Sequence, residues 1–146
     1  MSLTKENALS EYQQFKYTTK ILEHRLDTFG HVNNARYLEL YEEARWDFIH
    51  NSGYGLAEIL TKKQGPVVLD VNCRFKRELT NRETITILTQ TLKGKGKISS
   101  LKQEIIKADG TVASEATFTF GFMDFTQRKL IDPPDSWLKA IGVISP

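Results

Sequence analysis

The spacing of hydrophobic positions changes near Pro66 from a helical period to a period of two, which then persists. Before it, apolar and polar residues alternate over residues 15–21, as in a half-buried strand, and then follow a helical period from about Asn34 to about His50. After it, a period of two recurs in four successive segments, which predicts four strands. The order predicts an α+β fold, in which a five-stranded, mainly antiparallel sheet carries one long helix across one face.

Turn and cap residues set the expected limits of these elements. Asn51-Ser52-Gly53 is typical of a helix end, Gly65-Pro66 would stop a short helix over residues 55–63, and Asp109-Gly110 favours a hairpin turn. The later strands are expected at residues 67–75, 83–92, 98–108 and 111–125, with Val67, Leu69, Val71, Cys73 and Phe75 on one face of the first. We expect a single domain over residues 1–146, with an N-terminal extension at 1–10 and a short C-terminal helix at 135–144.

The long helix is amphipathic, but two of its residues break the pattern. Arg45 falls inside the apolar arc, and we expect it to pair with Glu42 one turn earlier, because a buried charge without a partner is costly. A role for Glu42 or Glu43 in facing a substrate stays open. Trp46 lies on the polar face, where a subunit contact would cover it.

Composition narrows the class of protein. The chain has 146 residues, of which 40% are hydrophobic and 26% charged, enough for one globular domain with a real core. No apolar run approaches the roughly 20 residues of a membrane span, and the polar N-terminus has no secretory signal. A single Cys suits a reducing compartment, so we expect the cytoplasm. The net charge of +2 and the lack of a recognition motif predict no nucleic-acid partner.

Residues 26–37, LDTFGHVNNARY, crowd polar side chains immediately before the long helix. They can be explained as a turn at Asp27 and Gly30 followed by an N-cap at Asn33 or Asn34. The same geometry also suits catalysis, because free N–H groups at a helix N-terminus can stabilise an oxyanion. Asp27 could then act as a base or a nucleophile, and His31 as a donor or proton carrier.

Other catalytic motifs are missing from the sequence. There is no GxSxG elbow, P-loop or GxGxxG motif, and three His with one Cys make a metal site an unfavoured expectation. Cys73 is a weak candidate nucleophile, because it falls on the apolar face of its strand. We expect no metal and no redox cofactor.

The stretch from Asp27 to Tyr37, DTFGHVNNARY, continues as LELYEEARWDF. It closely resembles the D-x-x-x-H-V-N-N-A-x-Y…E-x-A-R motif of hotdog-fold acyl thioesterases of the 4-hydroxybenzoyl-CoA thioesterase-like family. The chain looks most like the bacterial long-chain acyl-CoA branch, and the resemblance covers nearly its whole length. It implies a sheet that wraps the long helix, and subunits that join edge to edge as homodimers or homotetramers.

The resemblance also implies roles for particular residues. Asp27 matches the catalytic aspartate of the family, and His31 and Asn33 match the His and first Asn of its HVNN motif. Plant acyl-carrier-protein thioesterases share that motif but carry a catalytic Asn where this chain has Phe29, so the simpler scheme centred on Asp27 is favoured. A catalytic Glu on the helix, as in another branch of the fold, is the lesser alternative for Glu42 or Glu43.

The implied substrate is an acyl-CoA with a fatty or aryl acyl group. Its chain is expected in an apolar slot between helix and sheet, near Tyr37 and Tyr41, with the carbonyl oxygen at the N–H groups of Asn33, Asn34 and Ala35. The CoA phosphates call for basic side chains, and the candidates are Arg74, Lys76, Arg77 and the turn with Lys93, Lys95 and Lys97. Exposed Lys on strands and turns also serves solubility and edge protection, so each of these is open to that explanation.

Three alternatives stay open beside this expectation. The substrate could be an acyl-carrier-protein thioester instead of acyl-CoA. The chain could be a non-catalytic acyl-binding protein, because a fold alone does not guarantee activity. It could also be a hydratase or dehydratase on the same fold, although the His-containing motif of those enzymes is not found in it.

Overall fold

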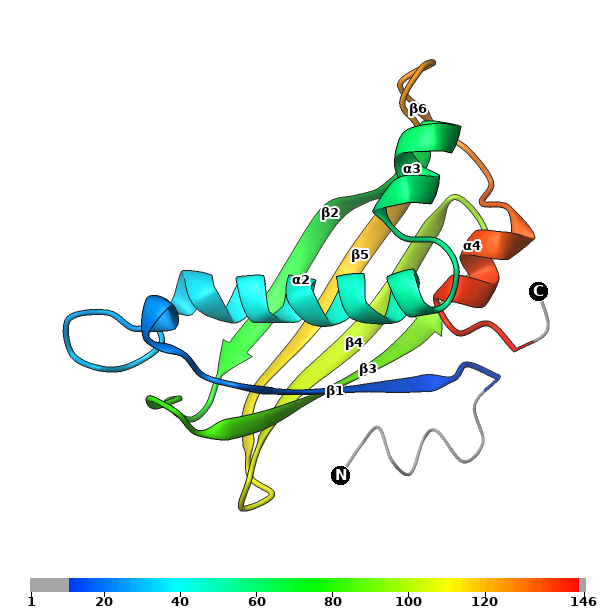
Figure 1. The fold of residues 1–146 in the computed structure, drawn as a ribbon. Helices are drawn as coiled ribbons and strands as arrows, with labels where there is room; N and C mark the ends of the chain where they lie inside the picture. The colour runs from blue at the N-terminus through cyan, green and yellow to red at the C-terminus, as the bar shows by residue number, and fades with distance from the viewer. Residues whose placement is uncertain (1–10, 145–146) are drawn as a thin grey trace.

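The computed structural model describes residues 11–144. One antiparallel sheet forms the body of the molecule, in the order β1-β3-β4-β5-β2, with the short β6 paired to the end of β5. The predicted α+β class is confirmed (Figure 1). The strands are β1 (Gln14–Lys20), β2 (Gln64–Phe75), β3 (Thr84–Lys93), β4 (Ile98–Lys107), β5 (Val112–Asp124) and β6 (Lys129–Leu130).

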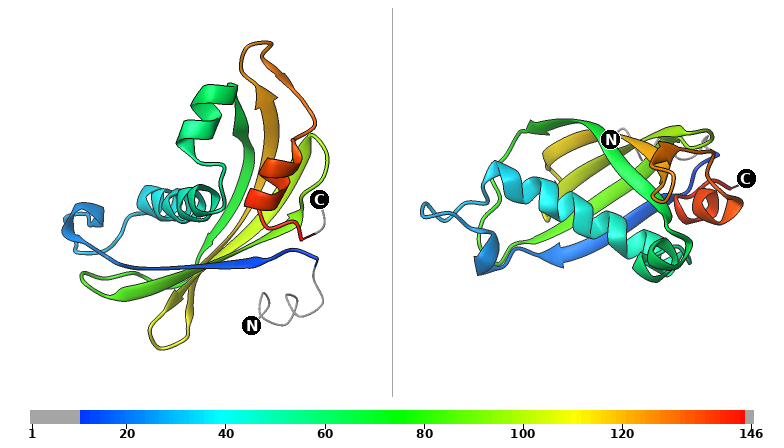
Figure 2. Two further views of the ribbon diagram at one scale, coloured as in Figure 1. Left: turned by 45° about the vertical axis from the view of Figure 1, so that its right-hand side comes forward. Right: turned by 90° about the horizontal axis from the view of Figure 1, so that it is seen from above.

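The long helix α2 (Asn34–Asn51) lies in the hollow of the curled sheet, which bends around it from β2 to β1 (Figure 2). Its apolar stripe packs on the inward side chains of β3, β4 and β5, and together they form the core. The residues of α2 that are buried in this core are Tyr37, Leu40, Tyr41, Ala44, Phe48 and Ile49. No helix in residues 11–144 is long and apolar enough to span a membrane.

Local capping explains where the helices begin and end. The Asn33 side chain accepts a hydrogen bond from Arg36 N and so caps α2. The short helix α3 (Leu56–Lys62) follows and ends at Lys63, which adopts a left-handed conformation. The C-terminal helix α4 (Asp135–Ala140) is shorter than the expected range of 135–144, because the chain turns at Gly142 with φ +92°. The expected N-terminal extension at 1–10 lies outside the described residues.

A β-bulge in β2 corrects the predicted side-chain pattern of this strand. The register with β5 shifts between Val68 and Asp70, so Val68 pairs with Phe120 and Val71 with Phe118. Directly paired residues share a face, and Phe118 and Phe120 both face the helix. Val68 therefore faces the core side with Val71, and Val67 and Leu69, predicted there, face the other side.

The strand β2 lies at one edge of the sheet and pairs only with β5 among the described strands. Several of its apolar side chains are largely exposed: Val68, Leu69, Val71 and Phe75. An exposed, apolar edge strand is the kind of surface that pairs with another strand.

Candidate active site

The loop before α2 is a tight hairpin built around Asp27. Asp27 N donates to His31 O at 2.9 Å, and Gly30, with φ +80°, makes the turn. One carboxylate oxygen of Asp27, Oδ1, accepts hydrogen bonds from Phe29 N (2.9 Å) and His31 N (3.3 Å). The other, Oδ2, has no hydrogen-bond partner among residues 11–144, so it can bind a water molecule or attack a substrate. Phe29 at the loop apex is 84% exposed.

Arg25 ties this loop to the body of α2. Its guanidinium donates to Glu39 at 3.0 Å and to Glu43 at 2.5 Å, and Glu43 also accepts from the Tyr17 hydroxyl at 2.5 Å. Burial, together with the bond to Glu43, raises the pKa of Tyr17 to about 12. The carboxylate of Glu43 is therefore engaged by Tyr17 and Arg25, and its bond to Arg25 helps to hold the Asp27 loop in place.

The N-terminus of α2 follows the loop at once. Asn33 uses its side-chain oxygen as the cap, and Asn34 Oδ1 accepts from Ala35 N at 3.1 Å. The N–H of Asn34 belongs to the first turn and has no acceptor within the helix. The geometry leaves Asn34 N–H as the donor most ready to receive an oxyanion, whereas Ala35 N–H already has a local acceptor.

A shallow groove of about 260 Å³ lies beside this helix end. It is lined by Val32, Asn34, Tyr37, Phe75, Lys76, Arg77 and Glu78. Tyr37 is itself buried and donates its hydroxyl proton to Arg77 O at 3.0 Å, and burial raises its pKa. The Arg77 side chain is exposed at the groove, a suitable place for a cation that binds phosphate.

Glu78 is a site residue that the sequence did not indicate. It lies in the loop after β2, and Oε2 approaches His31 Nε2 at 3.0 Å. His31 also forms a β-bridge with Thr80, so two contacts hold it against this loop. Nothing in the sequence marks Glu78, because its pairing with His31 depends on the approach of two distant loops.

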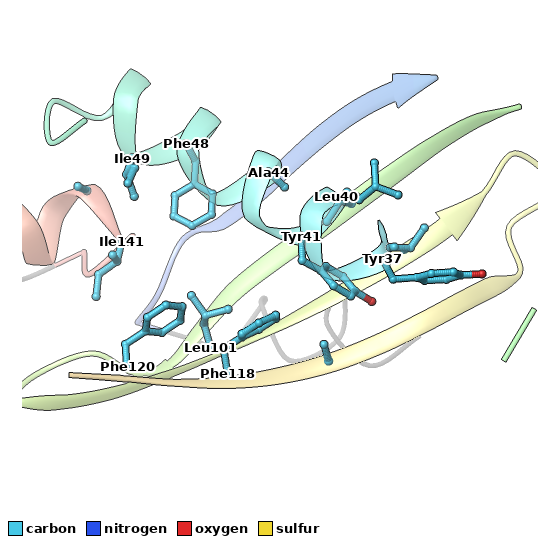
Figure 3. Close-up of a cluster of buried hydrophobic side chains, with 14 of the residues drawn as sticks. Tyr37, Leu40, Tyr41, Ala44, Phe48, Ile49, Leu101, Phe118, Phe120 and Ile141 are labelled. Atoms are coloured by element: carbon cyan, nitrogen blue, oxygen red, sulfur yellow. The ribbon is translucent and has the colours of Figure 1, made fainter. Parts of the chain in front are cut away.

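An apolar cavity of about 180 Å³ lies under the C-terminal half of α2 instead of beside its N-terminus. Figure 3 shows Phe48 and Ile49 of the helix facing Phe120, Leu101 and Ile141 across it. Trp137 and Ile141 close it from the α4 end, and Thr91 Oγ1 donates to Ile141 O at 2.6 Å to hold that end in place. The cavity opens beside β2, where the exposed Glu42, Trp46 and Val68 form its mouth.

Tyr41, expected beside the acyl chain, is fully buried and lines neither space. Together with Tyr37, Leu40 and Ala44, it fills the interface between the N-terminal half of α2 and the sheet (Figure 3). The groove at the N-terminus of α2, whose lining does not include Asp27, and the apolar cavity are therefore separated within one chain by packed side chains.

Arg45 lines the cavity, and the predicted ion pair with Glu42 is wrong. Arg45 Nη1 donates to Gln103 Oε1 at 3.0 Å, and the guanidinium carbon lies 4.3 Å from the centre of the Phe118 ring. Glu42 is exposed at the mouth and makes no ion pair with it. Burial lowers the pKa of Arg45 to about 10, and the charge of Glu42 opposes this shift only in part.

The remaining basic candidates are spread over the molecule. Lys76 pairs with Glu115 at 2.8 Å, and Arg74 is exposed on the same strand face. Lys95 and Lys97 lie in the β3–β4 turn, whereas the Asp27 loop lies at the opposite end of β3, roughly 30 Å away by strand length. Among residues 11–144, no group of three or more His, Cys, Asp or Glu side chains could hold a metal ion.

Comparisons with known proteins show the family of this chain. A family model described as the thioesterase-like superfamily matches residues 22–141. The chain is 34% identical over 113 residues to the long-chain acyl-CoA thioesterase FadM of Escherichia coli (strain K12). The matched segment covers 77% of this chain and 85% of FadM.

Solved structures with the same fold include a probable thioesterase and a protein in complex with CoA. The probable thioesterase YbaW from Escherichia coli superposes with a TM-score of 0.76 and 30% sequence identity. The match covers 86% of this chain and 98% of the YbaW chain. The hypothetical protein SAV2348 from Staphylococcus aureus, in complex with CoA, superposes with a TM-score of 0.82 and 21% sequence identity. The match covers 89% of this chain and 82% of the SAV2348 chain. The predicted fold and enzyme class are confirmed: this chain belongs to the thioesterase-like superfamily and is a thioester hydrolase with the hotdog fold.

Proposed function

We propose that the thioester is an acyl-CoA, and that Asp27 and the N-terminus of α2 form the catalytic centre. The observation that carries this proposal is the Asp27 carboxylate, which the loop holds through Oδ1 just before α2 while Oδ2 remains available. The names of two similar proteins, a long-chain acyl-CoA thioesterase and a protein in complex with CoA, support the substrate class.

The reaction needs a base, a hydrogen-bond donor that stabilises the oxyanion, and a leaving group. Asp27 accepts a proton from a water molecule, whose oxygen adds to the acyl carbon. The negative charge that develops on the carbonyl oxygen is stabilised by Asn34 N–H and the positive end of α2. When the tetrahedral intermediate collapses, the C–S bond breaks, and the CoA thiolate leaves and takes up a proton.

A covalent route uses the same atoms. Asp27 Oδ2 attacks the acyl carbon and expels the thiolate, and water then opens the mixed anhydride to regenerate the carboxylate. Turnover in ¹⁸O-labelled water separates the two routes, because only the anhydride route can place the label in Asp27.

Asn33 and His31 act as positioning groups in this scheme. The Asn33 side chain is engaged as the cap of α2, so it fixes the helix end at which the oxyanion binds. His31 is held by Glu78, and its backbone N–H donates to Asp27 Oδ1, so it orients the carboxylate.

Arg77 is the basic residue that the geometry favours for the CoA phosphates, because it lies in the groove beside Asn34. An acyl-carrier-protein thioester shares the same thioester and pantetheine arm but lacks the nucleotide, so it would depend less on Arg77. Comparing thiol release from acyl-CoA and from the matched carrier-protein thioester tests the proposed substrate class. Preference for the carrier protein, or binding of acyl-CoA without turnover, would overturn the proposal.

A homodimer would complete the site. In each chain, β2 runs from the mouth of the cavity at Pro66 and Val68 to the groove at Phe75 and Arg77. If the β2 strands of two copies pair antiparallel, the groove and Asp27 loop of one copy lie next to the cavity mouth of the other. The exposed Val68, Val71 and Phe75, which would be covered by this pairing, support it.

In such a dimer the thioester would lie at Asp27 of one subunit, and the acyl chain would enter the cavity of its partner. Trp46 at the cavity mouth would then be covered by the partner, as expected from its place on the helix. The cytoplasmic location and a further pairing into tetramers stay predictions.

A further inference from the structure

Arg45 is out of place in its surroundings. The cavity beneath α2 is otherwise lined mainly by apolar and aromatic side chains, yet the Arg45 guanidinium borders it. Removing a charge from water is costly unless a counter-charge or hydrogen bonds replace the lost hydration. A side chain that bears this cost inside an apolar cavity therefore needs an explanation.

The contacts of Arg45 explain its position, but its charge is offset only in part, by Glu42 at the mouth of the cavity. A guanidinium has five N–H donors, and among the described residues only one acceptor is present, the uncharged amide oxygen of Gln103. The Phe118 and Phe120 rings, at 4.3 and 5.3 Å from the guanidinium carbon, attract the cation through their faces. No carboxylate in residues 11–144 makes an ion pair with it.

A second donor borders the same cavity. Ser99 of β4 pairs with Phe120, so its side chain faces the core side of the sheet, and it lines the cavity with Arg45. Its hydroxyl has no hydrogen-bond partner among the described residues. A cationic donor and a hydroxyl thus border one apolar space.

Resting on the proposed function, we propose that this cavity selects acyl groups that carry an acceptor oxygen, a carboxylate or a hydroxyl, on the part of the chain that enters it. Such an oxygen would accept from Arg45 and Ser99, and a carboxylate would also form the ion pair with Arg45 that Glu42, at the mouth of the cavity, does not make. A cavity of about 150 Å³ holds a benzene ring, so this one, at about 180 Å³, has room for a segment of that size or slightly larger.

Thiol release from matched acyl-CoAs tests this selection. At each chain length, the plain, ω-hydroxy and ω-carboxy acyl-CoAs are compared with the wild type, Arg45→Met and Ser99→Ala. We expect the wild-type kcat/KM to be higher for the oxygenated chains than for the plain chain. In Arg45→Met this preference should fall by roughly tenfold or more, which is the scale of one charge-assisted hydrogen bond. Ser99→Ala should reduce the ω-hydroxy preference with little change in packing.

The controls separate selection from folding and from the reaction itself. Arg128→Met removes an exposed arginine from the turn before β6, away from the cavity, and should keep the wild-type preference. If Arg45→Met does not fold, Ser99→Ala and Arg45→Lys still decide, since Lys keeps the charge and should retain part of the ω-carboxy preference.

Equal wild-type rates on plain and oxygenated chains, or a preference unchanged in both the Arg45 and Ser99 variants, would overturn the selection and leave the thioesterase proposal intact. No thiol release from any acyl-CoA would instead overturn the proposed function. Displacement of a fluorescent fatty acid by free dicarboxylic and plain fatty acids measures the selection without turnover, so the two failures can be told apart.

Discussion

The Tyr41 hydroxyl donates a hydrogen bond of 2.7 Å to Ser114 Oγ across the buried boundary between α2 and β5. This contact lies in the packed layer that separates the groove at the N-terminus of α2 from the apolar cavity within one chain. The layer is why the acyl chain, in our account, must reach the cavity from the β2 edge instead of along the helix.

Tyr41→Phe should destabilise the fold and leave hydrolysis nearly intact. The change removes one buried hydrogen bond, and Ser114 keeps only a long contact of 3.6 Å to Cys73, so a loss of about 1–2 kcal/mol is expected. Urea unfolding and the acyl-CoA assay measure the two effects. A large fall in kcat with unchanged stability would mean that Tyr41 contacts the substrate after all.

Arg25→Met should lower kcat more than it raises KM. Arg25 holds the Asp27 loop to Glu39 and Glu43, so its loss would misplace the carboxylate without removing a substrate contact. Stability should fall by about 1–2 kcal/mol, since both carboxylates are partly exposed and rehydrate. Arg36→Met is the matched control, because Arg36 binds Glu39 alone. Equal losses of kcat in the two variants would argue against a role in positioning Asp27.

Tyr17 predicts a loss of stability at high pH. Its pKa is about 12 in the folded chain and about 10 in an unfolded one, so the folded state holds the proton more tightly. This contribution to stability is complete below pH 10 and disappears as the pH rises towards 12.

Urea unfolding across this range should show a shallower pH dependence for Tyr17→Phe than for the wild type. Tyr41, whose pKa is also raised by burial, keeps part of the slope in both proteins. Identical slopes in the wild type and the variant would show that Tyr17 is not coupled to folding in this way.

Val71→Lys should break the proposed dimer and, with it, hydrolysis. Val71 is 39% exposed on the β2 edge, and a charge there would be buried against the partner strand. Leu92→Lys, at an exposed apolar position near the end of β3, is the control. Light scattering and the acyl-CoA assay are measured together. A monomeric Val71→Lys with full activity would mean that each chain holds a complete site.

The sequence predicts those features that depend on local chemistry. The limits of α2 were expected at about Asn34 and His50 and are found at Asn34 and Asn51, because the Asn33 cap and the apolar period act within a few residues. The family motif also placed Asp27, His31 and Asn33 around the start of α2, where the structure has them, although their roles stay predictions.

Features that depend on distant partners were missed. The bulge at Val68 arises from pairing with β5, and no local signal marks it. Arg45 was expected to pair with Glu42 one turn earlier, but packing turns it towards Gln103, 58 residues along the chain. The division between groove and cavity likewise depends on how Tyr41 meets Ser114, which the helical period alone cannot give.

The most direct test of the central claim is single-turnover hydrolysis of a long-chain acyl-CoA by the wild type and by Asp27→Asn. Asn keeps the hydrogen-bond acceptor that holds the loop but is neither a base nor a carboxylate nucleophile. We predict a rate roughly 100-fold to 10,000-fold lower, with binding and thermal stability almost unchanged. A rate within a few-fold of the wild type would contradict the account and move the catalytic centre away from Asp27.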